Sequence, residues 1–191
     1  MAEDQTLIEI KDLCKYFQLS RRRVLKAVDG VNLRIKKGEV LGVVGESGCG
    51  KTTLGRMTLN LLTPTSGGVI YDGINLLELS REKMRRMRRH MQIVFQDPYS
   101  SLNPRMTIGN ILAIPMGIQG LYEGMRKERV MYLLDRVGLS GQAINRFPHE
   151  YSGGQLQRIG IARALAVDPA FIVADEPVSA LDISIQSQVL N

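Results

Sequence analysis

The fold is decided by the stretch Gly45-Glu46-Ser47-Gly48-Cys49-Gly50-Lys51-Thr52-Thr53, which has the P-loop form G-x-x-x-x-G-K-S/T. The apolar residues 40–44 before it predict a buried strand, and the pattern over residues 54–62 predicts a helix. A polyphosphate needs several backbone N–H groups turned toward it, and only residues without a Cβ allow so tight a wrap. Because a strand leads in and a helix leads out, the stretch predicts a phosphate-binding loop rather than an ordinary glycine-rich turn.

The side chains of this loop suit a nucleoside triphosphate with a divalent cation. We expect Lys51 to place its charge on the β- and γ-phosphates, Thr52 to bind Mg²⁺ and Thr53 to hold the α-phosphate. The first turn of the following helix adds the positive end of its dipole. The other residues expected to contact the nucleotide are Gly45, Glu46, Ser47, Gly48, Cys49 and Gly50.

Length and composition indicate a single α/β domain. The chain has 191 residues, of which 44% are hydrophobic, enough for one sizeable core. The net charge of +6 is compatible with nucleic acid, an anionic membrane surface or phosphate ligands, so charge alone does not identify a partner. Cys14 and Cys49 form no C-x-x-C pair, which argues against a disulfide framework or a zinc site and favours a reducing, intracellular setting. No apolar run approaches the roughly 18 residues that a membrane span needs.

The N-terminal part of the chain predicts a small antiparallel sheet. Residues 7–13 and 24–35 alternate apolar and polar side chains, as half-buried strands do. Tyr16 and Phe17 lie between these two strands, ahead of a basic loop. Either ring is able to stack on adenine and either fits an ordinary core position, and we favour Phe17 as the adenine contact.

Two helical regions follow the P-loop. The pattern over residues 81–90 carries six basic side chains, with Met84 and Met87 facing inward. It is either a solvated helix face or a patch that binds phosphate or a partner. Residues 106–150 predict a helical insertion interrupted by glycines.

Two further predicted strands end in polar side chains. Residues 91–95 lead to Gln96, and residues 171–174, a predicted buried strand, lead to Asp175 and Glu176. Open α/β sheets place their ligands at the carboxyl ends of such strands. Asp175 suits the binding of Mg²⁺, and Glu176 suits the binding of a water molecule. When the two residues are considered alone, an ordinary acidic turn on the surface is the alternative to such a site.

Five elements therefore occur in a fixed order: GESGCGKTT, Gln96 at a strand end, YSGGQLQR, FIVADEP and SALD. Together they resemble the ATP-binding cassette (ABC) ATPases, and S-G-G-Q before a helix is that family's own mark. The resemblance covers the chain from about Leu7 onward. It implies an α/β P-loop NTPase core with an antiparallel β subdomain and a helical subdomain at about residues 106–150, all within one domain, 1–191.

The resemblance also implies ATP and Mg²⁺ as cofactors. Thr52, Gln96 and Asp175 would hold Mg²⁺, and Glu176 would be the general base for the water that attacks the γ-phosphate. We therefore expect Glu176, Gln96 and Lys51 to form the catalytic set.

A head-to-tail dimer of two such domains follows from the same resemblance. Ser152, Gly153 and Gly154 would cap the γ-phosphate of ATP held by the partner chain, and Gln155 belongs to the same motif. Asp182, within SALD, would join the dimer contact.

Within the family, QDPYSSLNPRMTIGNIL and RRHMQIVFQDP are similar to the ATPases of bacterial dipeptide, oligopeptide and nickel importers. Such subunits are peripheral, on the cytoplasmic face of the inner membrane, and dock through the Gln96 loop and the helical insertion onto separate permease subunits without binding the transported substrate. Two alternatives remain: a soluble ABC ATPase that acts on nucleic acid or ribosomes, and a nucleotide-dependent binding module without catalysis. The single P-loop argues against the first, and Glu176 argues against the second.

The family's switch histidine, on a strand beyond SALD, has no counterpart here, because His90 and His149 both precede that motif. We therefore expect a domain without its closing strands, with nucleotide binding retained and hydrolysis weak or absent.

Overall fold

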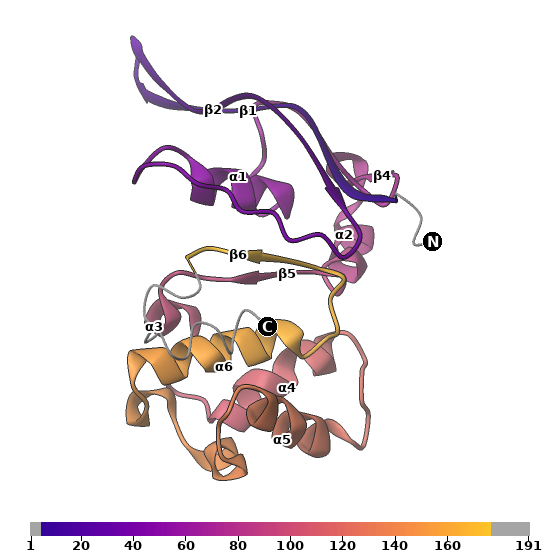
Figure 1. Ribbon diagram of the computed structural model, residues 1–191, viewed down its shortest axis with the longest axis vertical. Helices are drawn as coiled ribbons and strands as arrows, with labels where there is room; N and C mark the ends of the chain where they lie inside the picture. The colour runs from indigo at the N-terminus through magenta and orange to yellow at the C-terminus, as the bar shows by residue number, and fades with distance from the viewer. Residues whose placement is uncertain (1–4, 177–191) are drawn as a thin grey trace. The chain divides into compact units, whose positions relative to one another are not determined.

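The computed structural model describes residues 5–176 and forms two compact units, Met1–Arg85 and Arg86–Asn191 (Figure 1). The first unit contains an antiparallel sheet and the P-loop, and the second contains a pair of parallel strands with most of the helices. The predicted dimer contact at Asp182 lies outside the described residues. Within residues 5–176, no helix combines the length and the apolar character needed to cross a membrane.

The sheet of the first unit has four strands in the order β2-β1-β3-β4, each antiparallel to its neighbour. Its strands are β1 (Thr6–Ser20), β2 (Arg23–Lys36), β3 (Ser66–Tyr71) and β4 (Ile74–Asn75). The alternation of apolar and polar residues in the sequence matches their burial in the sheet. Ile8 and Ile10 of β1 are buried, as is Val69 of β3, while Lys11 is exposed. The predicted antiparallel strands are confirmed.

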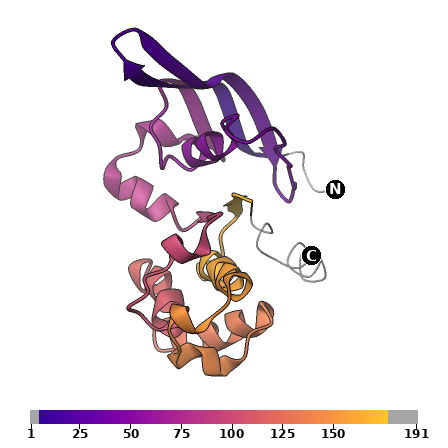
Figure 2. The ribbon, with the colours of Figure 1, turned by 90° about the vertical axis from the view of Figure 1, so that its left-hand side faces the viewer.

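The hairpin of β1 and β2 is longer than the sequence pattern predicts. Strand β3 pairs with β1 only from Ile8 to Cys14, and the hairpin continues past that point as two strands (Figure 2). The prediction that Tyr16 and Phe17 lie between the strands is wrong: both belong to β1, because the connecting turn is short and the ladder to β2 runs on to Ser20.

The first unit also contains α1 (Lys51–Thr58) and η1 (Leu76–Glu78). Helix α2 (Arg81–Met87) begins in this unit and ends two residues past its last residue, Arg85. The helix after the P-loop is thus confirmed, although it ends earlier than predicted. The buried strand predicted at residues 40–44 is wrong, since this segment is irregular and Val40 and Val44 are almost fully exposed, at 98% and 96%. A strand exists only where a neighbour completes its ladder, and within residues 5–176 no ladder includes this segment.

The second unit is built on two parallel strands in register, β5 (Met91–Val94) and β6 (Phe171–Ala174). Its helical elements are α3 (Pro98–Ser101), α4 (Ile108–Ile118), α5 (Arg126–Arg136), η2 (Gly141–Asn145), η3 (Pro148–Glu150) and α6 (Gly153–Leu165). Strand β6 was expected to be buried, but its residues are only half-buried or exposed. Helix α6 packs on β5, and a parallel strand is fully buried only where helices cover both of its faces.

Helices α4, α5 and α6 pack against one another around the apolar core of the second unit (Figure 1). Fully buried members from these three helices include Leu112, Leu134 and Ile159. Gly109 of α4 lies so close to η2 that a Cβ on it would come within 2.5 Å of the Ile144 Cγ1 atom. The predicted helices within residues 106–150 are therefore present, and they share their core with α6.

Candidate nucleotide-binding site

The P-loop adopts a backbone that requires glycine at two positions. Gly48 has φ +79° and Gly50 has φ +103°, both in the left-handed region. Gly50 is also the residue that caps the N-terminus of α1, and a Cβ on it would lie 2.2 Å from the Ala27 carbonyl oxygen of β2. The loop therefore runs directly against the sheet, in a path that a larger residue at position 50 would block.

The Lys51 ammonium lies over this loop. Its Nζ donates to the backbone carbonyls of Gly45 and Glu46, at 2.7 and 2.8 Å. Thr52 and Thr53 follow in the first turn of α1, where backbone N–H groups have no intrahelical acceptor. The first unit thus brings together a positive charge, a helix N-terminus and a glycine-rich loop. All three attract a polyanion such as a triphosphate.

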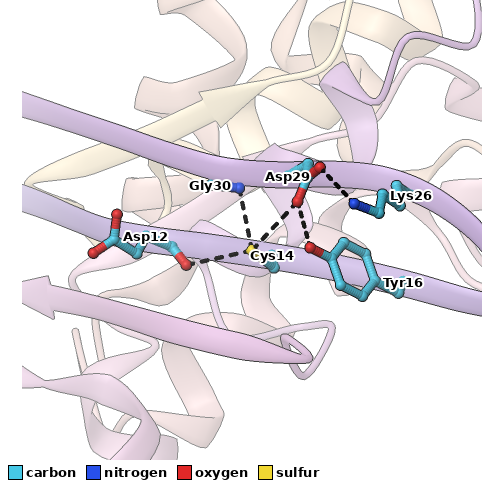
Figure 3. Close-up of polar contacts among 6 residues, drawn as sticks. All are labelled: Asp12, Cys14, Tyr16, Lys26, Asp29 and Gly30. Atoms are coloured by element: carbon cyan, nitrogen blue, oxygen red, sulfur yellow. Dashed lines mark hydrogen bonds and ion pairs between the residues drawn. The ribbon is translucent and has the colours of Figure 1, made fainter.

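Tyr16 and Phe17 have different partners on the hairpin. The Tyr16 hydroxyl donates to Asp29, whose other carboxylate oxygen is 3.1 Å from the Lys26 Nζ (Figure 3). The Tyr16 hydroxyl, and then Lys26, lower the pKa of the Asp29 carboxyl, and the bond to Asp29 raises the pKa of Tyr16. Cys14 joins this cluster through its Sγ, which accepts from the Gly30 N–H. The polar end of Tyr16 is therefore occupied within the hairpin.

Phe17 is associated with the segment that follows α1. The Lys15 Nζ lies 5.2 Å from the centre of the Phe17 ring and donates to the Thr63 carbonyl at 2.7 Å. Lys15 thus joins the Phe17 ring to the segment after α1. The Tyr16 N–H joins the same segment by donating to the Thr65 Oγ1 at 2.9 Å. The Tyr16 hydroxyl is bonded to Asp29, whereas the Phe17 ring has no polar group, and Phe17 as the adenine contact stays a prediction.

In the second unit, the two predicted catalytic side chains meet at the carboxyl ends of β5 and β6. The Gln96 Nε2 donates to the Glu176 Oε2 at 2.6 Å. The Asp175 N–H continues the parallel ladder by donating to the Val94 carbonyl, at 3.0 Å. Glu176 has φ +48°, an unusual value for a residue with a Cβ and one that occurs often at functional sites.

The S-G-G-Q segment forms the N-terminus of α6. Ser152 caps the helix: its Oγ accepts from the Gln155 N–H, and its own N–H donates to the Gln155 Oε1 at 3.0 Å. This reciprocal capping box fixes the first turn. Gln155 therefore stabilises the start of α6 as part of this capping box. The N–H groups of Gly153 and Gly154 lie at the positive end of a thirteen-residue helix.

Sequence reasoning missed two polar side chains of α6. Gln157 is only 1% exposed and donates to the Phe95 carbonyl, and Arg163 donates to the Ser101 carbonyl. The available signal was a polar residue at position 157 in the same helical stripe as Gly160 and Ala164, both of which are buried.

The residues expected to hold Mg²⁺ suit that ion chemically. Thr52, Gln96 and Asp175 offer only oxygen ligands with a single carboxylate, and Mg²⁺ typically takes one or two carboxylates together with water and phosphate oxygens. Because Gln96 uses its Nε2 for Glu176, its Oε1 is the atom suited to a cation. Among residues 5–176, no three His, Cys, Asp or Glu side chains gather into a metal-binding group.

The model of the ABC transporter family matches residues 28–179. The chain belongs to the ABC transporter family. It is 54% identical over 186 residues to a putative peptide import ATP-binding protein of Brucella ovis, an alignment that covers 97% of this chain and 58% of that protein. It is also 54% identical to the oligopeptide transport ATP-binding protein OppF of Bacillus subtilis, covering 98% of this chain and 62% of the relative. This ABC transporter chain thus spans about three fifths of the length of these relatives.

Solved ABC structures have the same fold. The dimeric ATP-binding cassette MJ0796 in a post-hydrolysis state, bound to ADP and Pi, superposes with a TM-score of 0.89 and 31% identity, covering 96% of this chain and 80% of that one. The predicted α/β fold of the ABC ATPases is therefore confirmed.

Proposed function

We propose that this chain is the nucleotide-binding part of an ABC importer, and that it couples hydrolysis of Mg-ATP to the uptake of peptides, with nickel or other metal chelates as the alternative cargo. The hydrogen bond between Gln96 and Glu176 carries the proposal, because it joins a metal-ligand type of side chain to a candidate general base at two strand ends. The cargo class rests on the relatives, which are peptide and oligopeptide import proteins.

The first unit would bind the triphosphate. Lys51 would exchange its bonds to the Gly45 and Glu46 carbonyls for phosphate oxygens, which are stronger acceptors because they are charged. The glycines of the loop would turn their N–H groups toward the same oxygens. Phe17 would stack on the adenine ring.

The second unit would supply the chemistry of hydrolysis. Glu176 would accept the proton of the attacking water at a carboxylate oxygen, and the amide of Gln96 would hold that carboxylate in place. Bound Mg²⁺, held by Thr52, Gln96 and Asp175, would neutralise the charge that develops on the phosphates.

The proposed partners are a second ABC ATPase subunit and separate permease subunits at the cytoplasmic face of the membrane. The N–H groups of Gly153 and Gly154 at the N-terminus of α6 would bind the γ-phosphate of ATP held by the other subunit. Large apolar side chains that suit permease docking are exposed near the Gln96 loop and on the helices, namely Tyr99 at 61%, Ile118 at 64% and Met125 at 63%.

Replacement of Glu176 with Gln tests the proposed reaction. The amide keeps the size of the side chain but cannot accept a proton from water, so we expect ATP turnover to fall by about 100-fold or more while ATP affinity stays unchanged. ATP turnover is measured by phosphate release, and affinity by calorimetry. Measurable wild-type turnover that Glu176→Gln leaves unchanged would contradict the proposed role of Glu176. ATP binding without wild-type turnover would agree with the weak hydrolysis expected from the sequence and favour a binding module for this chain.

A further inference from the structure

Helix α6 holds both ends of the segment that carries Gln96. The Gln157 Nε2 donates to the carbonyl of Phe95, the residue before Gln96, at 3.3 Å. Six residues further along the helix, the Arg163 guanidinium donates to the carbonyl of Ser101, the last residue of α3. Both acceptors are backbone atoms, so the two bonds restrain the path of residues 95–101.

A third contact joins the middle of this segment to the start of α6. The ring of Tyr99 lies beside Gly153, where a Cβ would be 3.7 Å from the Tyr99 Cε2 atom. Contacts to the segment therefore extend along α6 from its first residue to Arg163.

The burial of Gln157 indicates that this side chain does more than fill space in the core. The side chain is 1% exposed, and an amide removed from water is unfavourable unless it is hydrogen-bonded. An apolar side chain would fill the same volume without that requirement. The ladder between β5 and β6 ends with the bond from Asp175 to Val94, so the Gln157 bond to Phe95 is the next restraint on the chain before Gln96.

We propose that Gln157 and Arg163 are positioning residues, which fix the Gln96 segment to α6 so that Gln96 stays within reach of Glu176 and moves together with the Ser152 end of the helix. The functional part of this inference rests on the proposed function. The attachment itself is independent of nucleotide.

Hydrogen–deuterium exchange of the 191-residue chain tests the attachment directly. Gln157→Leu and Arg163→Met each remove one of the two hydrogen bonds to the segment, and we expect amide exchange in residues 95–102 to rise about tenfold. The matched control is Arg158→Met on the same helix, which removes a bond to the Val137 carbonyl at the end of α5. That control should raise exchange at residues 133–139 and leave residues 95–102 unchanged. Wild-type exchange at residues 95–102 in both test variants would overturn the proposal.

A second variant, whose effect is switched by pH, keeps the test decisive if Gln157→Leu fails to fold. In Gln157→Glu the ionised carboxylate has no proton to donate to Phe95, whereas the protonated acid does. Protection of residues 95–102 should therefore be lost at pH 8 and recover toward that of the wild type at pH 5, compared at each pH. Equal protection at both pH values would count against the attachment.

Nucleotide affinity with and without Mg²⁺ tests the link to function. In Gln157→Leu we expect the gain in ATP affinity on adding Mg²⁺ to shrink by about tenfold, with Mg-free affinity unchanged. An unchanged Mg²⁺ effect despite faster exchange would refute the positioning role. If the wild-type chain bound no ATP at all, the proposed function would fail, and the exchange result alone would decide the attachment.

Discussion

Substitution of Gly50 with Ala is the sharpest test of how the P-loop is built. At φ +103° a residue with a Cβ is strained, at a cost of about 1–2 kcal/mol. The new methyl group would also lie 2.2 Å from the Ala27 oxygen and 3.3 Å from its carbonyl carbon. These are backbone atoms of a paired strand, so they cannot rotate away as a side chain would.

The clash adds to the strain. Overpacking of a well-packed site costs about 1–3 kcal/mol, which brings the expected total to about 2–5 kcal/mol. Small domains have a total stability of only about 5–15 kcal/mol, so the effect is large. We also expect weaker ATP binding, because the loop must leave β2 to relieve the clash.

Two other glycines serve as controls. Gly48→Ala has the strain of φ +79° but no atom within 4 Å of the new Cβ, so we expect only about 1–2 kcal/mol. Gly42→Ala has neither strain nor contact and should be close to neutral. Because the chain has no tryptophan, urea unfolding is followed by circular dichroism. If Gly50→Ala is no less stable than Gly48→Ala, the close approach of the loop to β2 is wrong.

Three further predictions concern the cap, the hairpin and the base contact. Ser152→Ala removes the side-chain cap of α6 and should lower the free energy of unfolding by about 1 kcal/mol in urea titrations. A variant as stable as the wild type would show that the capping box does not stabilise the protein. The pKa of Asp29 is lowered below 3.8 by Tyr16 and Lys26, so its contribution is present above that pH and is lost as pH falls through the lower value of the folded state. The stability difference between wild type and Asp29→Asn should therefore shrink between pH 5 and pH 2, and a constant difference would contradict this linkage. Phe17→Ala should weaken ATP binding by about tenfold in calorimetry, while Tyr16→Ala, which also removes a ring, leaves it unchanged; the reverse order would make Tyr16 the base contact.

Local signals in the sequence were sufficient for the P-loop and for the helices. The glycines of the loop and the helix at Lys51 depend on neighbouring residues, so the motif predicts them directly. The same holds for the expectation that Gln96 and Glu176 each follow a strand, because each strand is a short apolar run in the sequence. The parallel pairing of the two strands is seen only in the structure.

Features that depend on distant partners were not predictable in the same way. Residues 40–44 have a strand-like sequence, but a strand also needs a neighbour to complete its ladder. The sequence pattern places Tyr16 and Phe17 between the two strands, whereas the structure places them in β1, because the length of a hairpin depends on its register with the opposite strand. Gln157 and Arg163 each donate to a backbone carbonyl that lies 62 residues away in the sequence. A helical pattern in the sequence does not reveal such distant acceptors.

The central claim is that this P-loop binds the triphosphate of ATP through Lys51. Calorimetric titration of the wild-type chain, Lys51→Ala and Lys127→Ala with Mg-ATP tests it most directly, since Lys127 is an exposed lysine on α5 and controls for the loss of charge. We expect binding by the wild type, unchanged affinity in Lys127→Ala and an affinity about 10- to 100-fold lower in Lys51→Ala, from the loss of charge-assisted hydrogen bonds. Equal affinity in Lys51→Ala and the wild type would contradict the claim.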